Sequence, residues 1–275
     1  MSQIVAIWGT PNSGKTTLAV KLSRYITKFR KHKVICVLTD PETPSIQVLF
    51  TNYATSEMQS IGVALSAVTC AAKDVYKGSV TVEDCPDLLY MGYCRSENIN
   101  SYPVVYESKA RDFYTVLSKM ADYVIVDCVS NARENVLSKV AIKMADVVVR
   151  LYSADIKSLA YMESQASLYN GLEYKFPNHV KILNCTSRDI FLPVDEIASR
   201  MDGCKAVVPF MKILKQQMAD GQLYMPIPGT KVDRAFEKLF KLVAAEDEWE
   251  NEKKAKKAQK REEKQRKKEL KSKTV

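Results

Sequence analysis

The chain has 275 residues, of which 46% are apolar, and this content is enough to bury one large core in a single main domain. It contains no run of 18 apolar residues, which excludes a membrane-spanning helix, and its first residues enter an apolar strand without a signal peptide, so we expect a cytoplasmic protein. The net charge of +9 lies mostly near the C-terminus, because residues 251–275 alone carry +8.

The first motif along the chain is a phosphate-binding loop. Residues 9–16 read G-T-P-N-S-G-K-T and match the pattern G-x-x-x-x-G-K-[ST]. They lie between an apolar run at residues 4–8 and an amphipathic helix whose apolar face comprises Leu18, Leu22, Tyr25, Ile26 and Phe29. The helix N-terminus would hold nucleotide phosphates, with Lys15 on the β and γ oxygens and Thr16 on Mg²⁺. The alternative is a Gly/Pro-rich turn with a solvated lysine.

Two later strands end close to an aspartate. Val34–Leu38 reads as a buried parallel strand with Asp40 just beyond it, and Tyr123–Asp127 follows a helix predicted over Glu107–Met120. An apolar strand that delivers an aspartate to a phosphate loop is the Walker B arrangement, in which the carboxylate orders Mg²⁺ and its waters. Taken alone, such an aspartate is also common as a helix N-cap.

Residues 51–104 show weak patterns, and we expect a helical and loop-rich stretch with a short strand near Leu88–Gly92. The rest of the chain alternates regularly between helices and strands. Helices are predicted over residues 136–144, 156–168, 193–201, 211–218 and 232–243, and strands over residues 147–151, 180–184 and 206–208.

This alternation predicts an α/β P-loop NTPase fold, with a mainly parallel twisted sheet and helices on both faces. Ligands in such sheets bind at the carboxyl ends of the strands. Gly9, Asp40, Asp127 and Asn184 all lie at predicted strand ends, and this convergence predicts a single site.

The cysteines and histidines do not suggest a metal or disulfide framework. The seven cysteines include no C-x-x-C pair, so we expect reduced thiols that act as small buried side chains. The two histidines, His32 and His179, flank predicted strands, and we expect both at the surface.

The main domain is predicted over residues 1–245, followed by a charged tail over residues 246–275 that is either helical or disordered. Within residues 251–275 there are 12 Lys or Arg and 4 Asp or Glu. Such a segment is either a solvated extension without a partner or a weak binding element for DNA or other anionic surfaces. Its few apolar residues form no hydrophobic face, which argues against an amphipathic membrane anchor.

Residues 1–245 resemble the MinD/ParA group of P-loop ATPases. The resemblance rests on the phosphate loop, on D-P-E at residues 40–42, on Y-V-I-V-D-C at residues 123–128, on A-D-V-V at residues 145–148, and on the segment from Val207 through Pro209 to Pro226. It implies ATP and Mg²⁺ as ligands, with Lys15 and Asp40 catalytic, Asp40 positioning the attacking water, and Mg²⁺ held by Thr16 and, through water, by Asp127. The implied nucleotide-binding residues are Gly9, Pro11, Asn12, Ser13, Gly14, Lys15, Thr16, Thr17, Asn184, which contacts the base, and Pro209.

Two departures from the group bear on hydrolysis. Thr10 stands where the group has a second lysine that reaches across a nucleotide-sandwiched dimer, and residues 128–131 contain neither the proline nor the glycine of its second switch. We therefore expect weak, slow ATPase activity, in a protein that the resemblance implies to be a homodimer.

Within the group the chain most resembles the TadZ/CpaE-type pilus assembly ATPases in their receiver-less form. The W-G-x-P-N-S-G-K-T-T loop, the T-D-x-E-T-P segment and the A-D-V-V-V-R-L strand carry this resemblance. It implies an ATPase that positions a pilus or secretion machine, with those apparatus proteins as partners at the inner face of the membrane. The alternatives are a partition ATPase that binds DNA non-specifically and an ATP-dependent small-molecule synthetase, for which Asp40 and Glu42 are the one candidate acid pair.

Overall fold

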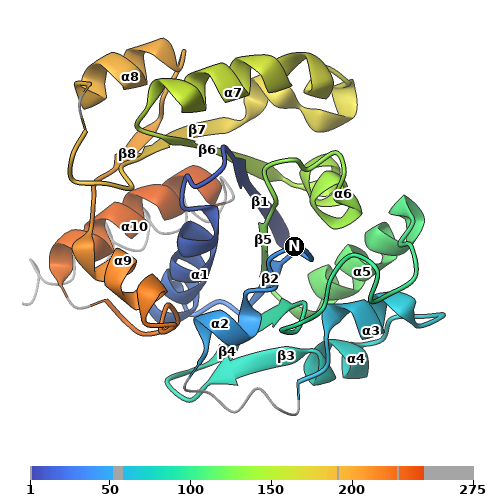
Figure 1. The fold of residues 1–275 in the computed structure, drawn as a ribbon. Coiled ribbons are helices and arrows are strands. Elements are labelled where there is room, and N and C mark those ends of the chain that lie inside the picture. Colours follow the sequence, from blue (N-terminus) through green and yellow to red (C-terminus); the bar gives the residue numbers. More distant parts are fainter. Residues whose placement is uncertain (1, 52–57, 191, 228, 245–275) are drawn as a thin grey trace, which may run out of the picture.

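The computed structural model describes residues 2–51, 58–190, 192–227 and 229–244, and its centre is an eight-stranded sheet with the order β3-β4-β2-β5-β1-β6-β7-β8 (Figure 1). Neighbouring strands are parallel except for the antiparallel pair β3 and β4 at one edge. The predicted α/β fold with a mainly parallel sheet is thus confirmed. The strands are β1 Gln3–Gly9, β2 Val34–Leu38, β3 Ser79–Val82, β4 Cys85–Gly92, β5 Tyr123–Asp127, β6 Val147–Ser153, β7 Val180–Asn184 and β8 Ala206–Val208.

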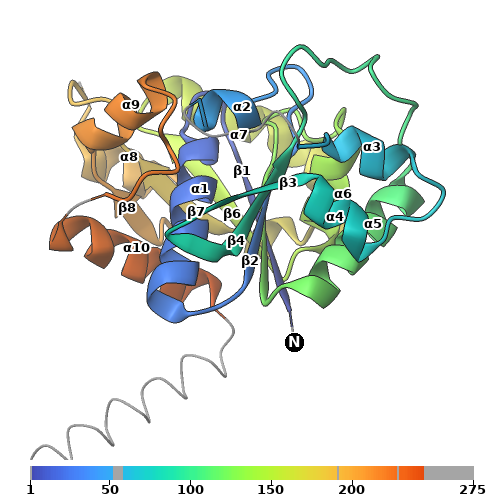
Figure 2. The same cartoon turned by 90° about the horizontal axis from the view of Figure 1, so that it is seen from below.

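Helices cover both faces of this sheet. Side chains of α3 to α8 share one core, and those of α1, α2 and α10 share the other. Figure 2 shows α1, α9 and α10 together on one side of the strands and α3 to α6 on the other. The α-helices are α1 Lys15–Tyr25, α2 Ile46–Leu49, α3 Ile61–Ser66, α4 Ala72–Lys77, α5 Glu107–Met120, α6 Val136–Met144, α7 Ile156–Ala166, α8 Val194–Arg200, α9 Lys212–Ala219 and α10 Thr230–Val243.

The central strands are continuous apolar runs because both of their faces are covered. In β1, Ala6 and Trp8 point into one core while Val5 and Ile7 point into the other, as the two-residue period of a strand requires. The parallel register aligns the strand ends, since Ile7 of β1 and Leu38 of β2 both lie opposite the last residue of β5. The carboxyl ends of β1, β2 and β5 therefore meet at one edge of the sheet.

Two expectations about single residues are wrong. The first helix continues beyond Tyr25 as a π-helical segment, Ile26–Arg30, whose wider turn rotates Phe29 off the apolar face and leaves it 56% exposed. His179 is buried rather than exposed, because its ring packs edge-on against Trp8 and Nε2 lies 2.8 Å from the carbonyl oxygen of Tyr174. This burial lowers the pKa of His179 to about 4.

The region around residues 51–104 contains more sheet than the sequence indicated. The expected short strand near Leu88–Gly92 is the second half of β4. The whole of β4 forms a hairpin with the edge strand β3, and its residues from Leu88 onward pair with β2. Pro86 precedes this pairing and lies exposed, so its missing N–H costs no hydrogen bond to β2. All seven cysteines are free thiols, and the expected burial holds for four of them, whereas Cys70, Cys94 and Cys204 are half-buried.

The predicted tail over residues 246–275 lies outside the described residues, so its helical or disordered state stays a prediction. Within the described part of the chain, no helix combines the length and the apolar content that crossing a bilayer requires.

Candidate nucleotide-binding site

The loop between β1 and α1 depends on a glycine at each end. A Cβ atom on Gly9 would lie 2.1 Å from the carbonyl oxygen of Leu151, so only glycine allows β6 to approach this closely. Gly14 precedes the first turn of α1 with φ +85°, and a Cβ there would lie 2.5 Å from Nδ2 of Asn184. The loop backbone therefore packs closely against the backbone of β6 and against the Asn184 side chain at the end of β7.

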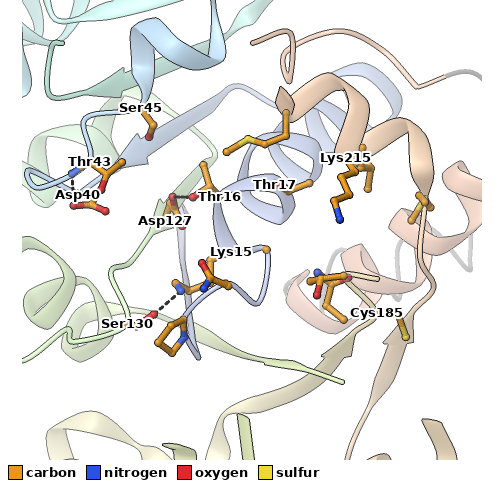
Figure 3. Close-up of a pocket in the computed structure, with 18 of the residues that line it drawn as sticks. Lys15, Thr16, Thr17, Asp40, Thr43, Ser45, Asp127, Ser130, Cys185 and Lys215 are labelled. Carbon is orange, nitrogen blue, oxygen red and sulfur yellow. Dashed lines mark hydrogen bonds between the residues drawn. The ribbon is translucent and has the colours of Figure 1, made fainter. Parts of the chain in front are cut away.

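Lys15 is folded back along the loop. Its Nζ donates to the carbonyl oxygen of Thr10 at 2.9 Å and to Oγ of Ser130 at 2.7 Å (Figure 3). Burial lowers the pKa of Lys15, while the nearby carboxylate of Asp127 opposes that shift. The ammonium thus lies against the loop backbone, and Lys15 also lines the cavity described below.

Thr16 and Asp127 meet at the carboxyl end of β5. The Thr16 hydroxyl donates to Oδ2 of Asp127 at 2.6 Å, whereas the buried Oδ1 of the same carboxylate has no partner among the described residues. Burial raises the pKa of Asp127 to about 6.

This donor set fits Mg²⁺. The described residues contain no cluster of three or more His, Cys, Asp or Glu side chains that could hold a metal by themselves. Mg²⁺ usually takes one or two carboxylates and completes its shell with waters and substrate phosphates. One unpartnered carboxylate oxygen beside a threonine hydroxyl, next to a phosphate loop, is what such an ion requires.

A cavity of about 780 Å³ runs along the loop, which is within the size range of small-ligand sites. Gly9 and Ser13 do not line it. Ser13 instead accepts a hydrogen bond at its carbonyl oxygen from Nδ2 of Asn184 and donates its hydroxyl to the carbonyl oxygen of Thr10. The expected site residues that do line the cavity are Pro11, Asn12, Gly14, Lys15, Thr16, Thr17, Asp40, Asp127, Asn184 and Pro209.

The cavity has a polar end and a more apolar end. Asp40, Asp127 and Ser130 lie on one side of the loop in Figure 3, while Cys185 and Lys215 lie on the other. Lys215 extends from α9 toward the cavity (Figure 3). Apolar side chains from the same segment also line the wall near Pro209, namely Phe210, Met211, Leu214 and Met218.

Asp40 and Glu42 do not form the acid pair that a synthetase would need. Oδ1 of Asp40 accepts the backbone N–H groups of Glu42 and Thr43 at 2.9 and 3.0 Å, so this carboxylate also shapes its own turn. Asp40 lines the cavity, whereas Glu42 is exposed and does not. Only one of the two carboxylates therefore faces the site.

Thr10 is a buried structural residue. Its hydroxyl lies 3.0 Å from that of Ser158 at the start of α7, and the Ser158 oxygen also accepts the backbone N–H of Ser153. Thr10 thus joins the loop to α7 and carries no charge.

Several residues that line the cavity were not predicted from the sequence, among them Ser130, Phe210, Met211, Leu214 and Lys215. Ser130 could have been found from the sequence, because it follows the last residue of β5 by only three positions. No sequence pattern identifies the α9 residues, since helical spacing does not tell which side of α9 faces a cavity.

No family model and no curated protein sequence matches this chain. Solved structures share its fold at low identity. The septum site-determining protein MinD from Pyrococcus horikoshii OT3, solved with Mg-ADP, is 19% identical with a TM-score of 0.66, over 87% of this chain and 94% of that one. A ParA family ATPase from Chlorobium tepidum TLS is 13% identical with a TM-score of 0.69, over 86% and 96%. McdA from Cyanothece is 14% identical with a TM-score of 0.61, over 89% and 100%. The chain therefore has the fold of the MinD/ParA-type P-loop proteins.

Proposed function

We propose that this protein binds Mg-ATP and hydrolyses it slowly, as an ATPase of the MinD/ParA kind. The observation that carries the proposal is one cavity whose lining combines Lys15, Thr16 and Asp127 with Asn184 and an apolar wall. Such a cavity matches the two halves of a nucleotide, its charged phosphates and its flat base. The MinD of similar fold was solved with Mg-ADP, which supports the same ligand class here.

Each residue has a role that follows from its place. Lys15 binds the β and γ oxygens, and the backbone N–H groups of the loop surround the phosphates. Thr16 and Asp127 hold Mg²⁺, which neutralises charge that develops on the phosphates during transfer. Asp40 orients the attacking water from the end of β2, and Asn184 contacts the base.

Hydrolysis is slow because Thr10 contributes no charge to the transition state, and such a charge is worth several orders of magnitude in P-loop enzymes. Phosphate release from Mg-ATP should stay well below roughly 10 per second, the median for enzymes. Asp40→Asn retains an oxygen that can accept from Thr43, so it should reduce turnover while leaving ATP affinity within about twofold. Fast turnover without a partner, or equal turnover in the variant, would contradict these roles.

We further propose that the ATPase acts as a homodimer that positions or assembles a pilus or secretion machine at the inner face of the membrane, through partner proteins. The resemblance of its loop and strand motifs to TadZ/CpaE-type proteins supports this role. The genes that neighbour this one test the proposal. We expect pilus or secretion genes beside it, whereas a neighbouring gene for a centromere-binding protein would contradict this role and favour a function in partition.

A second candidate is a partition ATPase, supported by the fold that the chain shares with a ParA family ATPase and by the charge of residues 251–275. In this case the full chain should retard DNA in a gel at low salt. Retardation should fade toward a few hundred millimolar salt and disappear in a chain that ends at Glu250, because phosphate contacts are screened and the charged segment is gone. A full chain that never retards DNA would exclude this candidate.

A further inference from the structure

A buried lysine joins the helix that follows the phosphate loop to a helix that lines the cavity. Lys21 lies on α1, six residues after Lys15, and its Nζ donates to Oε1 of Gln217 on α9 at 2.5 Å. The same Nζ donates at 2.6 Å to the carbonyl oxygen of Met225, in the segment that follows α9. Nε2 of Gln217 donates in turn to the carbonyl oxygen of Pro226 at 3.1 Å. One ammonium therefore ties α1 both to α9 and to the segment beyond it, and the three helices α1, α9 and α10 lie on the same side of the sheet (Figure 2).

This contact is the main anchor of α9. Of the eight residues of α9, all of which the structure describes, only Gln217 is buried. The apolar side chains of Ile213 and Met218 are 38% and 40% exposed, so α9 contributes no fully buried apolar side chain to the core. The position of α9 thus depends on the hydrogen bond between Gln217 and Lys21.

The ammonium of Lys21 is costly to bury. Lys21 is 3% exposed and both of its acceptors are uncharged, so no carboxylate among the described residues pairs with it. A buried charge is unfavourable unless hydrogen bonds compensate it. Because hydrogen bonds depend on distance and angle, the contact with Gln217 fixes the position of α9 along α1 more narrowly than apolar packing would.

A different side of α9 faces the cavity. Leu214, Lys215 and Met218 line it, whereas Gln217 does not. In Figure 3, Lys215 lies across the phosphate loop from Asp127, so α9 stands on the side of the cavity away from that carboxylate. The proposed Mg²⁺ and the phosphates that it binds occupy the side of Asp127. The apolar wall to which α9 contributes is therefore left for the nucleoside.

We propose that Lys21 is a positioning residue that holds α9 against the nucleoside part of a bound nucleotide, and thereby sets the affinity that the nucleoside adds to that of the phosphates. The inference rests on the proposed function. Lys21 does not line the cavity, so it acts on the ligand through Gln217 and α9.

Calorimetry on the full-length protein tests this with Mg-AMPPNP, a non-hydrolysable ATP analogue, and with Mg-tripolyphosphate, which has three phosphates and no nucleoside. Lys21→Met and Gln217→Ala should each weaken AMPPNP binding by about tenfold or more and leave tripolyphosphate affinity within about twofold, because the phosphate loop is untouched. Gln217→Glu keeps the acceptor for Lys21 and should retain most of the AMPPNP affinity. Gln216→Ala is the matched control, since Gln216 is exposed on the same helix and should not affect either ligand.

Labelling of Cys185 tests the same contact without any ligand. Cys185 is 6% exposed and lies on the same side of the cavity as Lys215 (Figure 3). A thiol reagent followed by peptide mass mapping should modify Cys185 several-fold faster in Lys21→Met and Gln217→Ala than in the wild type and Gln216→Ala. Cys36, which is fully buried in β2, should react equally slowly in all four proteins.

Unchanged AMPPNP affinity in both variants, or an equal loss for the two ligands, would overturn the inference. The same holds for unchanged labelling of Cys185, or for an equal acceleration at Cys36, which would show general destabilisation. A wild type that binds neither ligand refutes the proposed function, and the labelling then still decides whether Lys21 holds α9. A wild type that binds tripolyphosphate as tightly as AMPPNP refutes only the role of α9.

Discussion

The hydroxyl of Thr16 lies 2.6 Å from Oδ2 of Asp127, which joins the first turn of α1 to the end of β5. The two residues are 111 positions apart in the chain, and only the parallel pairing of β1 with β5 brings them together. Because the carboxylate is buried and its other oxygen has no partner among the described residues, its charge is unfavourable unless a cation is bound.

The burial of this carboxylate predicts how the stability of the nucleotide-free protein depends on pH. The pKa of Asp127 is about 6 in the folded state, above its ordinary value of 3.8, so the folded protein binds more protons than the unfolded chain between these values. The free energy of unfolding should therefore fall as pH rises from about 4 to 6, by at most about 3 kcal/mol from this group. Urea titrations of the wild type and Asp127→Asn should diverge over this window, with the variant lacking the fall. Parallel curves would show that the carboxylate is not destabilised by burial.

A second prediction concerns Gly14. Alanine there adopts an unfavourable positive φ and forces its Cβ toward Nδ2 of Asn184, which would displace that amide from the carbonyl oxygen of Ser13. Gly14→Ala should lose about 1–3 kcal/mol of stability and weaken ATP binding. Gly203→Ala is the matched control, because Gly203 has φ +91° with no atom within 4 Å of the added Cβ. Equal stability losses and unchanged ATP binding in both variants would mean that the contact with Asn184 does not matter.

Local sequence patterns predicted the phosphate loop, the apolar strands and the polar residues at their ends. Each of these depends on neighbours within a few residues, such as the spacing of Gly9, Gly14 and Lys15. The contact of Lys15 with Ser130 spans 115 positions, and no local pattern encodes it. The edge strand β3 was missed for a related reason, since four residues give too short a run to show a period of two.

A third prediction concerns Lys21, which is 3% exposed on α1. Its Nζ donates to Oε1 of Gln217 at 2.5 Å and to the carbonyl oxygen of Met225 at 2.6 Å, and burial lowers its pKa to about 7. The folded protein therefore binds fewer protons than the unfolded chain above pH 7, so the free energy of unfolding should rise with pH. The rise from this group should reach about 2 kcal/mol between pH 7 and 8.5.

Urea titrations across that pH range test the prediction for Lys21. In Lys21→Met the rise should disappear, because methionine fills a similar volume without a titrating group. Equal slopes in the wild type and the variant would place the titration elsewhere.

The most direct test of the proposed nucleotide site is calorimetric titration of the wild type and Lys15→Ala with Mg-ATP. Removal of a charge-assisted contact to two phosphates should lower the affinity by at least about 100-fold. Lys205→Ala, which removes an exposed lysine outside the cavity, serves as control and should bind as the wild type does. A wild type that binds Mg-ATP while Lys15→Ala binds it equally well would contradict the assignment of this cavity as the nucleotide site.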